Sequence, residues 1–195
     1  MKRFLALLMA SLMLLTLAAC NKTDEIAVGD GMKLAGRSAG NEAVEYSFQY
    51  PEEWTLIRND GVVEIQYDCN KSDAVAVYAN LAVLSFTLKD PNETAKQNWE
   101  GYQEEIKSVY SDYTLLDVEE YNEKDNYLDD APALKVKYKG TLGGLEYLVE
   151  QIICCRYGSV YYITLTVPNE YASEIDGVMK SVKQSFEFQD KGILG

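Results

Sequence analysis

Apolar and polar residues alternate along several short segments, and this pattern constrains the fold more than any other feature of the chain. In the first segment the apolar face carries Val44, Tyr46, Phe48 and Tyr50. A period of two is typical of a half-buried β-strand. Asp60 and Gly61 supply the chemistry of a tight hairpin turn. Further strands are predicted around residues 54–56, 63–67, 81–88, 113–121, 134–139, 145–155 and 160–167.

Two segments follow a helical period instead. Asp90, Pro91 and Glu93 form a helix start with an acidic capping box. After them the apolar positions recur at spacings of three and four, at Ala95, Trp99, Tyr102, Ile106 and Val109. A second helix is predicted from Asn169, with a buried face at Tyr171, Ile175, Val178, Val182 and Phe186. Consecutive hairpins with two amphipathic helices predict the α+β class, an antiparallel sheet flanked by helices.

The hairpin around Gly143 and Gly144 carries a pattern of opposite charges. Its first strand presents three lysines on one face, at Lys135, Lys137 and Lys139. Glu146 and Glu150 lie on one face of the second strand, so we expect ion pairs across the hairpin. Exposed pairs of this kind contribute only about 0.2–1 kcal/mol each, so they help strand register more than stability.

The N-terminal residues have the pattern of an export signal that ends in a cysteine. Lys2 and Arg3 precede an apolar stretch over residues 4–19, and Leu17, Ala18, Ala19 and Cys20 close it. These residues resemble the lipobox of bacterial lipoproteins. The resemblance implies that residues 1–19 are removed as a signal peptide and that the Cys20 thiol takes a diacylglycerol. Two acyl chains suffice for stable anchoring, so the protein is expected on a cell membrane, outside the cytoplasm, without spanning the bilayer.

The remainder is long enough for one domain. Residues 20–43 show no hydrophobic period and are predicted to form a flexible tether after the lipidated cysteine, with a domain over 44–188 and a tail over 189–195. The formal net charge is −13, and it becomes −15 without residues 1–19, which carry two basic and no acidic residues. An acidic chain is an unsuitable partner for nucleic acid. Acidity either favours solubility or, by our hypothesis, repels the domain from an anionic bilayer.

Three cysteines remain after acylation of Cys20, and their pairing is left open. Cys69 has the option of a disulfide with either Cys154 or Cys155, but adjacent strand residues point to opposite faces, so only one of them fits. Alternatively, Cys155 packs as a small core hydrophobe. The sequence contains no CxxC motif and no histidine, so no thiolate-activating imidazole is available.

The run Phe48-Gln49-Tyr50-Pro51-Glu52-Glu53-Trp54 resembles the F-x-Y-P-x-x-W opening of the PsbP-like superfamily, named for an extrinsic subunit of photosystem II. The segment Tyr161 to Val167, followed by a helix into Ser185 and Phe186, is similar to the end of that superfamily. The resemblance covers roughly Val44 to Phe188. It implies an antiparallel sheet sandwiched by helices and brings no set of catalytic residues. Members include assembly subunits of membrane complexes, a nuclear Ran-binding protein and bacterial lipoproteins.

Residues for catalysis and cofactor binding are scarce. Without histidine, a Ser-His-Asp or Cys-His arrangement is impossible, and no glycine-rich phosphate cradle lies between a strand and a helix. No cofactor is predicted. One acidic cluster is a weak candidate for Ca²⁺ or Mn²⁺, but a solvated acidic loop is the favoured explanation. Its members are Glu119, Glu120, Glu123, Asp125, Asp129 and Asp130.

Tyrosine is abundant, with 15 residues, and most of them fall on apolar faces. Tyr113, Tyr121 and Tyr127 lie near the acidic loop and are a candidate partner surface, since tyrosine is enriched at interfaces. The sequence therefore predicts a noncatalytic, membrane-anchored lipoprotein of the cell envelope that binds a protein partner or an envelope component. The alternative is a lipoprotein that binds a metal ion or small ligand; an enzyme has the least support.

Overall fold

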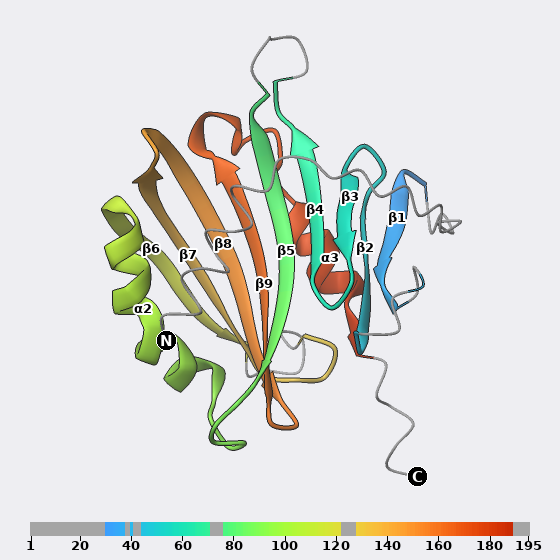
Figure 1. The fold of residues 1–195 in the computed structure, drawn as a ribbon, viewed down its shortest axis with the longest axis vertical. Coiled ribbons are helices and arrows are strands. Elements are labelled where there is room, and N and C mark those ends of the chain that lie inside the picture. The colour runs from blue at the N-terminus through green and yellow to red at the C-terminus, as the bar shows by residue number, and fades with distance from the viewer. Residues whose placement is uncertain (1–29, 38–39, 41–43, 71–75, 122–127, 189–195) are drawn as a thin grey trace.

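The computed structural model describes residues 30–37, 40, 44–70, 76–121 and 128–188. Within them the chain forms two antiparallel sheets, two α-helices and a short 3₁₀-helix (Figure 1). The larger sheet has seven strands in the order β3-β4-β5-β9-β8-β7-β6. The smaller has three in the order β1-β2-β10, where β10 is Glu187–Phe188. The predicted α+β class, an antiparallel sheet flanked by helices, is confirmed.

The strands of the large sheet follow the alternation in the sequence. They are β3 (Thr55–Asn59), β4 (Val63–Asp68), β5 (Tyr78–Thr87), β6 (Ser111–Tyr121), β7 (Ala133–Leu142), β8 (Leu145–Arg156) and β9 (Ser159–Pro168). The hairpin turn at Asp60 and Gly61 is confirmed, because β3 pairs with β4. The turn at Gly143 and Gly144 is confirmed as well, because Leu142 and Leu145 are paired residues of β7 and β8.

The large sheet buries both of its faces, each against a different layer. On one face, Leu134 and Val136 of β7 pack in a cluster with Trp99 and Ile106 of α2 (Ala95–Val109). On the other face a second cluster joins the sheet to the small sheet and to α3 (Val178–Ser185). Its members include Ile152, Cys154 and Ile163 from the sheet and Val178, Met179 and Val182 from α3. The sheet is therefore the middle layer between α2 and α3.

The motifs near the two ends of the domain, which carry the PsbP-like resemblance, meet in space. Phe186 stacks on Phe48 of β2 (Tyr46–Pro51), with ring centroids 6.0 Å apart. The Gln49 amide donates a hydrogen bond of 2.9 Å to Ser185 Oγ. Trp54 is 2% exposed and stacks on Tyr67 at 5.5 Å. The residues that carry the PsbP-like resemblance thus hold the small sheet and α3 against the large sheet, which is a structural role.

Part of the predicted tether belongs to the folded domain. Met32–Gly36 form β1, which pairs with β2 along its whole length, and Ala35 is fully buried. The prediction of a flexible tether over 20–43 therefore needs correction for these residues. The single hydrophobic residues of this segment show no regular spacing. An edge strand of five residues needs little periodicity, however, when its partner strand supplies the hydrogen bonds.

Both helix starts differ from the prediction. The N-cap of α2 is Thr94, which forms a capping box with Gln97, while Asp90 instead begins a turn by accepting a hydrogen bond from the Asn92 amide. The last helix does not start at Asn169. A 3₁₀-helix, η2 (Asn169–Tyr171), comes first, and α3 begins only after Gly177, whose φ of 90° interrupts the helix. Ile175, Val178 and Val182 are nevertheless buried, as predicted.

Candidate binding groove

A groove of about 420 Å³ lies between the large sheet and the segment that leads into α3. Strands β7, β8 and β9 form its floor, and the chain from η2 to the first turn of α3 forms its wall. Its polar lining consists of Lys135, Lys137, Glu150, Asp176 and Lys180. Its apolar lining consists mainly of Leu148, Leu165, Val167, Ala172, Ile175 and Met179.

Strand register explains why the β7 lysines face this groove. Lys135 is paired with Ile152 across the β7–β8 ladder, and Lys137 is paired with Glu150. Directly paired residues lie on the same face of a sheet. Ile152 belongs to the core cluster beneath α3, so the β7 lysines point toward the α3 layer. The α2 layer covers the opposite face, to which Leu134 and Val136 point.

The lysines of the groove differ in how well acidic groups compensate them. Lys135 Nζ lies 3.7 Å from Glu119 Oε2 and 3.8 Å from Glu150 Oε1, so two carboxylates share its charge. Lys139, further along β7, pairs with Glu146 at 3.1 Å. These contacts confirm the expected ion pairs across the β7–β8 hairpin. In the described part of the chain, Lys137 and Lys180 form no ion pair.

A fourth lysine, Lys183 on α3, lies close to the groove lysine Lys135. Burial lowers the pKa of Lys183 on α3, and the nearby charge of Lys135 lowers it further, while Glu119 acts in the opposite direction. Lys183 is therefore electrostatically coupled to the groove. The chain as a whole has 18 basic and 31 acidic residues, yet three lysines and two carboxylates line the groove. Lysine is thus more frequent in the groove, relative to acidic residues, than in the chain as a whole.

The apolar wall makes the groove amphipathic. Leu165, Val167, Ile175 and Met179 are at most 6% exposed and contribute their side chains from the core to the groove. Leu148 is half-buried and lies opposite Val167 in the β8–β9 ladder. A ligand in the groove would meet hydrocarbon on one side and ammonium groups on the other.

The candidate metal residues are not gathered at one point among the residues that the structure describes. Glu119 lies beside Lys135 on the α3 side, whereas Glu120 pairs with Lys96 on the α2 side at 2.6 Å. The Asp129 carboxylate accepts a hydrogen bond of 2.7 Å from the Phe188 amide. Asp130 lies next in the turn between Leu128 and Ala131. No three acidic or cysteine side chains come together within the described ranges.

Two members of that cluster, Glu123 and Asp125, lie outside the described residues. The metal hypothesis therefore stays a prediction, which calorimetry with Ca²⁺ and Mn²⁺ tests directly.

The candidate tyrosine surface is only partly described. Tyr113 is half-buried, and its ring packs on Tyr138 at 5.4 Å, so it belongs to the core beneath α2. Its hydroxyl is buried and has no hydrogen-bond partner among the described residues. Tyr121 pairs through its backbone with Ala133, and Tyr127 lies outside the described residues. The partner role of these tyrosines stays a prediction.

The three described cysteines are thiols. Cys154 is fully buried in the cluster beneath α3, and burial raises its pKa to about 12. Cys155 points to the opposite face, where burial raises its pKa to about 11. A raised pKa keeps a thiol protonated and poorly nucleophilic at neutral pH. Cys20, the predicted lipidation site, lies outside the described residues.

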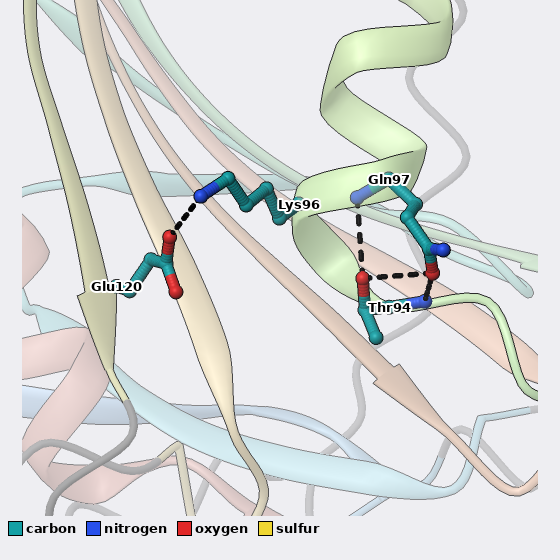
Figure 2. Close-up of polar contacts among 4 residues, drawn as sticks. All are labelled: Thr94, Lys96, Gln97 and Glu120. Carbon is teal, nitrogen blue, oxygen red and sulfur yellow. Dashed lines mark hydrogen bonds and ion pairs between the residues drawn. The ribbon is translucent and has the colours of Figure 1, made fainter.

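A second hollow of about 410 Å³ lies at the start of α2, near Lys96, Glu120, Pro132 and Cys155. Figure 2 shows that its polar groups already bind one another: Lys96 reaches Glu120 on β6, and Thr94 and Gln97 form the capping box. Among the described residues that line this hollow, none is a lysine without an ion pair or an activated thiol. The groove beneath α3 is the stronger candidate site.

Comparisons with known proteins agree on the fold. Neither a family model nor a curated protein matches this sequence. Among solved structures, the cyanobacterial PsbP protein CyanoP from Synechocystis aligns over 84% of this chain and 98% of its own, with 14% identity and a TM-score of 0.55. The fold is PsbP-like. It corresponds to the layered architecture described above and to the resemblance in the motifs at both ends of the domain.

Two further structures are similar to this PsbP-like chain. LpqN of Mycobacterium tuberculosis, a protein involved in cell envelope biogenesis, aligns over 80% of this chain and 88% of its own, with 12% identity and a TM-score of 0.53. A protein of Bacteroides thetaiotaomicron aligns over 76% of this chain at 13% identity and a TM-score of 0.46, and the chain spans about half of its length, 46%. In the described part of the chain, no helix combines the length and apolarity needed to cross a bilayer.

The sequence indicated part of the groove. Three lysines on one parity of a strand, in an acidic chain, are the signal that marks β7. Lys180 and the apolar wall gave no separate signal, because their place beside β7 depends on how the chain folds between Asn169 and α3.

Proposed function

We propose that this chain is a noncatalytic, lipid-anchored protein of the cell envelope, and that its PsbP-like domain binds an envelope component in the groove beneath α3. The observation that carries this proposal is the groove itself, in which Lys137 and Lys180, which form no ion pair with any described residue, lie beside an apolar wall in an otherwise acidic chain. Concave sites that combine hydrocarbon with a few polar groups are typical of ligand binding.

Two further observations support the proposal. The segment that ends in Leu17, Ala18, Ala19 and Cys20 has the order of charged, apolar and small residues of a lipoprotein signal. The similarity to LpqN adds a protein of the same fold that is involved in envelope biogenesis. A noncatalytic role agrees with the chemistry on hand, since the chain has no histidine and burial raises the pKa of its described thiols.

Metabolic labelling with palmitate tests the anchoring half of the proposal. The wild-type chain is expected to incorporate label and to sediment with membranes. Cys20→Ala is expected to lose both properties, while Cys69→Ala, which removes a cysteine inside the domain, keeps them. Equal labelling of wild type and Cys20→Ala, or an unlabelled wild type in the cytosol, would refute the anchor.

A further inference from the structure

We infer that the groove beneath α3 binds a single-chain anionic lipid, with the acyl chain along the apolar wall and the headgroup between Lys137 and Lys180. This inference rests on the proposed function and specifies the chemical class of the envelope component. The groove defined by Lys135, Lys137, Leu148, Glu150 and the residues of the α3 segment has a volume of about 420 Å³. That volume lies within the range of about 300–1,000 Å³ typical of small-molecule sites.

The charges that line the groove indicate which kind of lipid headgroup it binds. Lys135 is compensated by Glu119 and Glu150, but Lys137 on β7 and Lys180 on α3 have no ion pair within the described residues. They approach the groove from two different layers of the fold. Asp176 also lines the groove and offsets one of these two charges, and the two ammonium groups together favour an anion through charge-assisted hydrogen bonds. A neutral or zwitterionic headgroup gains less from the same two groups.

The apolar wall of the groove indicates that the rest of the ligand is hydrocarbon. Leu148, Leu165 and Val167 come from adjacent strands, and Ile175 and Met179 face them from the α3 segment. Leu148 and Ala172 are the half-buried members of this wall, and a small inorganic anion would leave their exposed surface in contact with water. An acyl chain covers this surface and removes its own methylene groups from water as well. The combination of lysines and hydrocarbon therefore selects an anionic amphiphile over free phosphate.

The groove also differs from the alternative of a purely structural charge network. Lys139 continues the same row on β7, but Glu146 compensates it and it does not line the groove. Among the lysines of β7, the one without an ion pair in the described part of the chain, Lys137, lies beside the apolar wall. This coincidence of position is what a binding site requires, whereas surface ion pairs alone do not predict it.

Photo-crosslinking tests the inference on the full chain, purified in a nonionic detergent. Lysophosphatidylglycerol and lysophosphatidylcholine, each with the same diazirine-bearing acyl chain, serve as the anionic and zwitterionic probes, and mass spectrometry locates the adducts. We expect adducts on the apolar wall of the groove, with about tenfold stronger labelling by the anionic probe. Excess inorganic phosphate should leave this labelling essentially unchanged.

Matched variants separate the groove from net charge. Lys137→Gln with Lys180→Gln is expected to weaken labelling by the anionic probe about tenfold. Lys89→Gln with Lys107→Gln removes the same charge at two exposed lysines outside the groove and should keep wild-type labelling. Leu148→Trp fills the groove without a change of charge and should abolish labelling by both probes, with an unchanged far-UV circular dichroism spectrum as the folding control.

Three outcomes would overturn the inference. Equal labelling by the two probes would contradict selectivity for an anionic headgroup. It would leave the proposed function intact, since the groove would still bind an envelope lipid. Displacement of the anionic probe by inorganic phosphate at equal concentration would remove the role of the acyl chain. Adducts that lie outside the groove, or that Lys137→Gln with Lys180→Gln does not weaken, would remove the site.

Discussion

Alanine at Gly36 should destabilise the domain far more than alanine at Gly31, although both glycines have a positive φ. Gly36 ends β1 with a φ of 80°, and Gly31 precedes β1 with a φ of 74°. In this conformation a residue with a Cβ is destabilised by roughly 1–2 kcal/mol. A Cβ at Gly31 meets nothing within 4 Å, whereas a Cβ at Gly36 would overlap the Tyr46 carbonyl oxygen and lie 3.2 Å from Ser47 Cα.

The overlap adds an overpacking cost of about 1–3 kcal/mol at Gly36. We therefore expect the free energy of unfolding to fall by about 1 kcal/mol in Gly31→Ala and by about 3 kcal/mol in Gly36→Ala. With a urea m-value of about 2 kcal/mol/M, the midpoints should fall by about 0.5 M and 1.5 M. Trp54 and Trp99, which are 2% and 3% exposed, report on the two sides of the sheet by fluorescence.

Equal midpoints for the two variants would refute this reasoning. They would mean that β1 does not pack on β2, and that residues 20–43 form the tether that the sequence predicts. An unchanged m-value in both variants is the control, because it shows that the same surface is exposed on unfolding.

Three other predictions follow from the structure. Thr94→Ala should lower the stability of the domain by about 1 kcal/mol because it removes the cap of α2, while Asp90→Ala should cost a few tenths, as measured by urea unfolding. Burial raises the pKa of Cys154 and Tyr110 to about 12 each, from ordinary values of 9 and 10. The unfolded state therefore releases these protons first, so unfolding titrations at several pH values should show stability falling as pH rises from about 9 to 12; stability that is flat over this range would contradict the burial of these groups. Alkylation of Cys154 by N-ethylmaleimide at pH 7.5 should require unfolding, so peptide mass mapping should find it unmodified in the native protein; fast labelling would contradict its position in the core.

The sequence predicted the large sheet well because strand parity is a local property. The alternation around Val44 to Tyr50 and the lysine row on β7 need no knowledge of the rest of the chain. The turn at Gly143 and Gly144 follows from the same local chemistry. Parity also predicted ion pairs between the lysines of β7 and the glutamates of β8, and Lys135 with Glu150 and Lys139 with Glu146 form them.

The errors arose where neighbouring structure decides the outcome. Asp90 and Thr94 both suit an N-cap, and Thr94 takes the role because Gln97 completes its capping box. β1 exists because β2 offers it an edge, which no pattern in residues 32–36 reveals. Prediction of the groove would have required knowing that the helix breaks at Gly177. This break determines where α3 places Lys180 relative to β7.

A photo-crosslinking amino acid placed at Ala172, an uncharged residue that lines the groove, tests the central claim most directly in the full chain and in intact cells. The same residue placed at Lys107 on the α2 side of the sheet is the control. The account predicts an adduct with an envelope component for position 172 in the membrane fraction and none for position 107. Equal adducts at both positions, or none at position 172, would contradict the claim that the groove beneath α3 is the binding site of an anchored envelope protein.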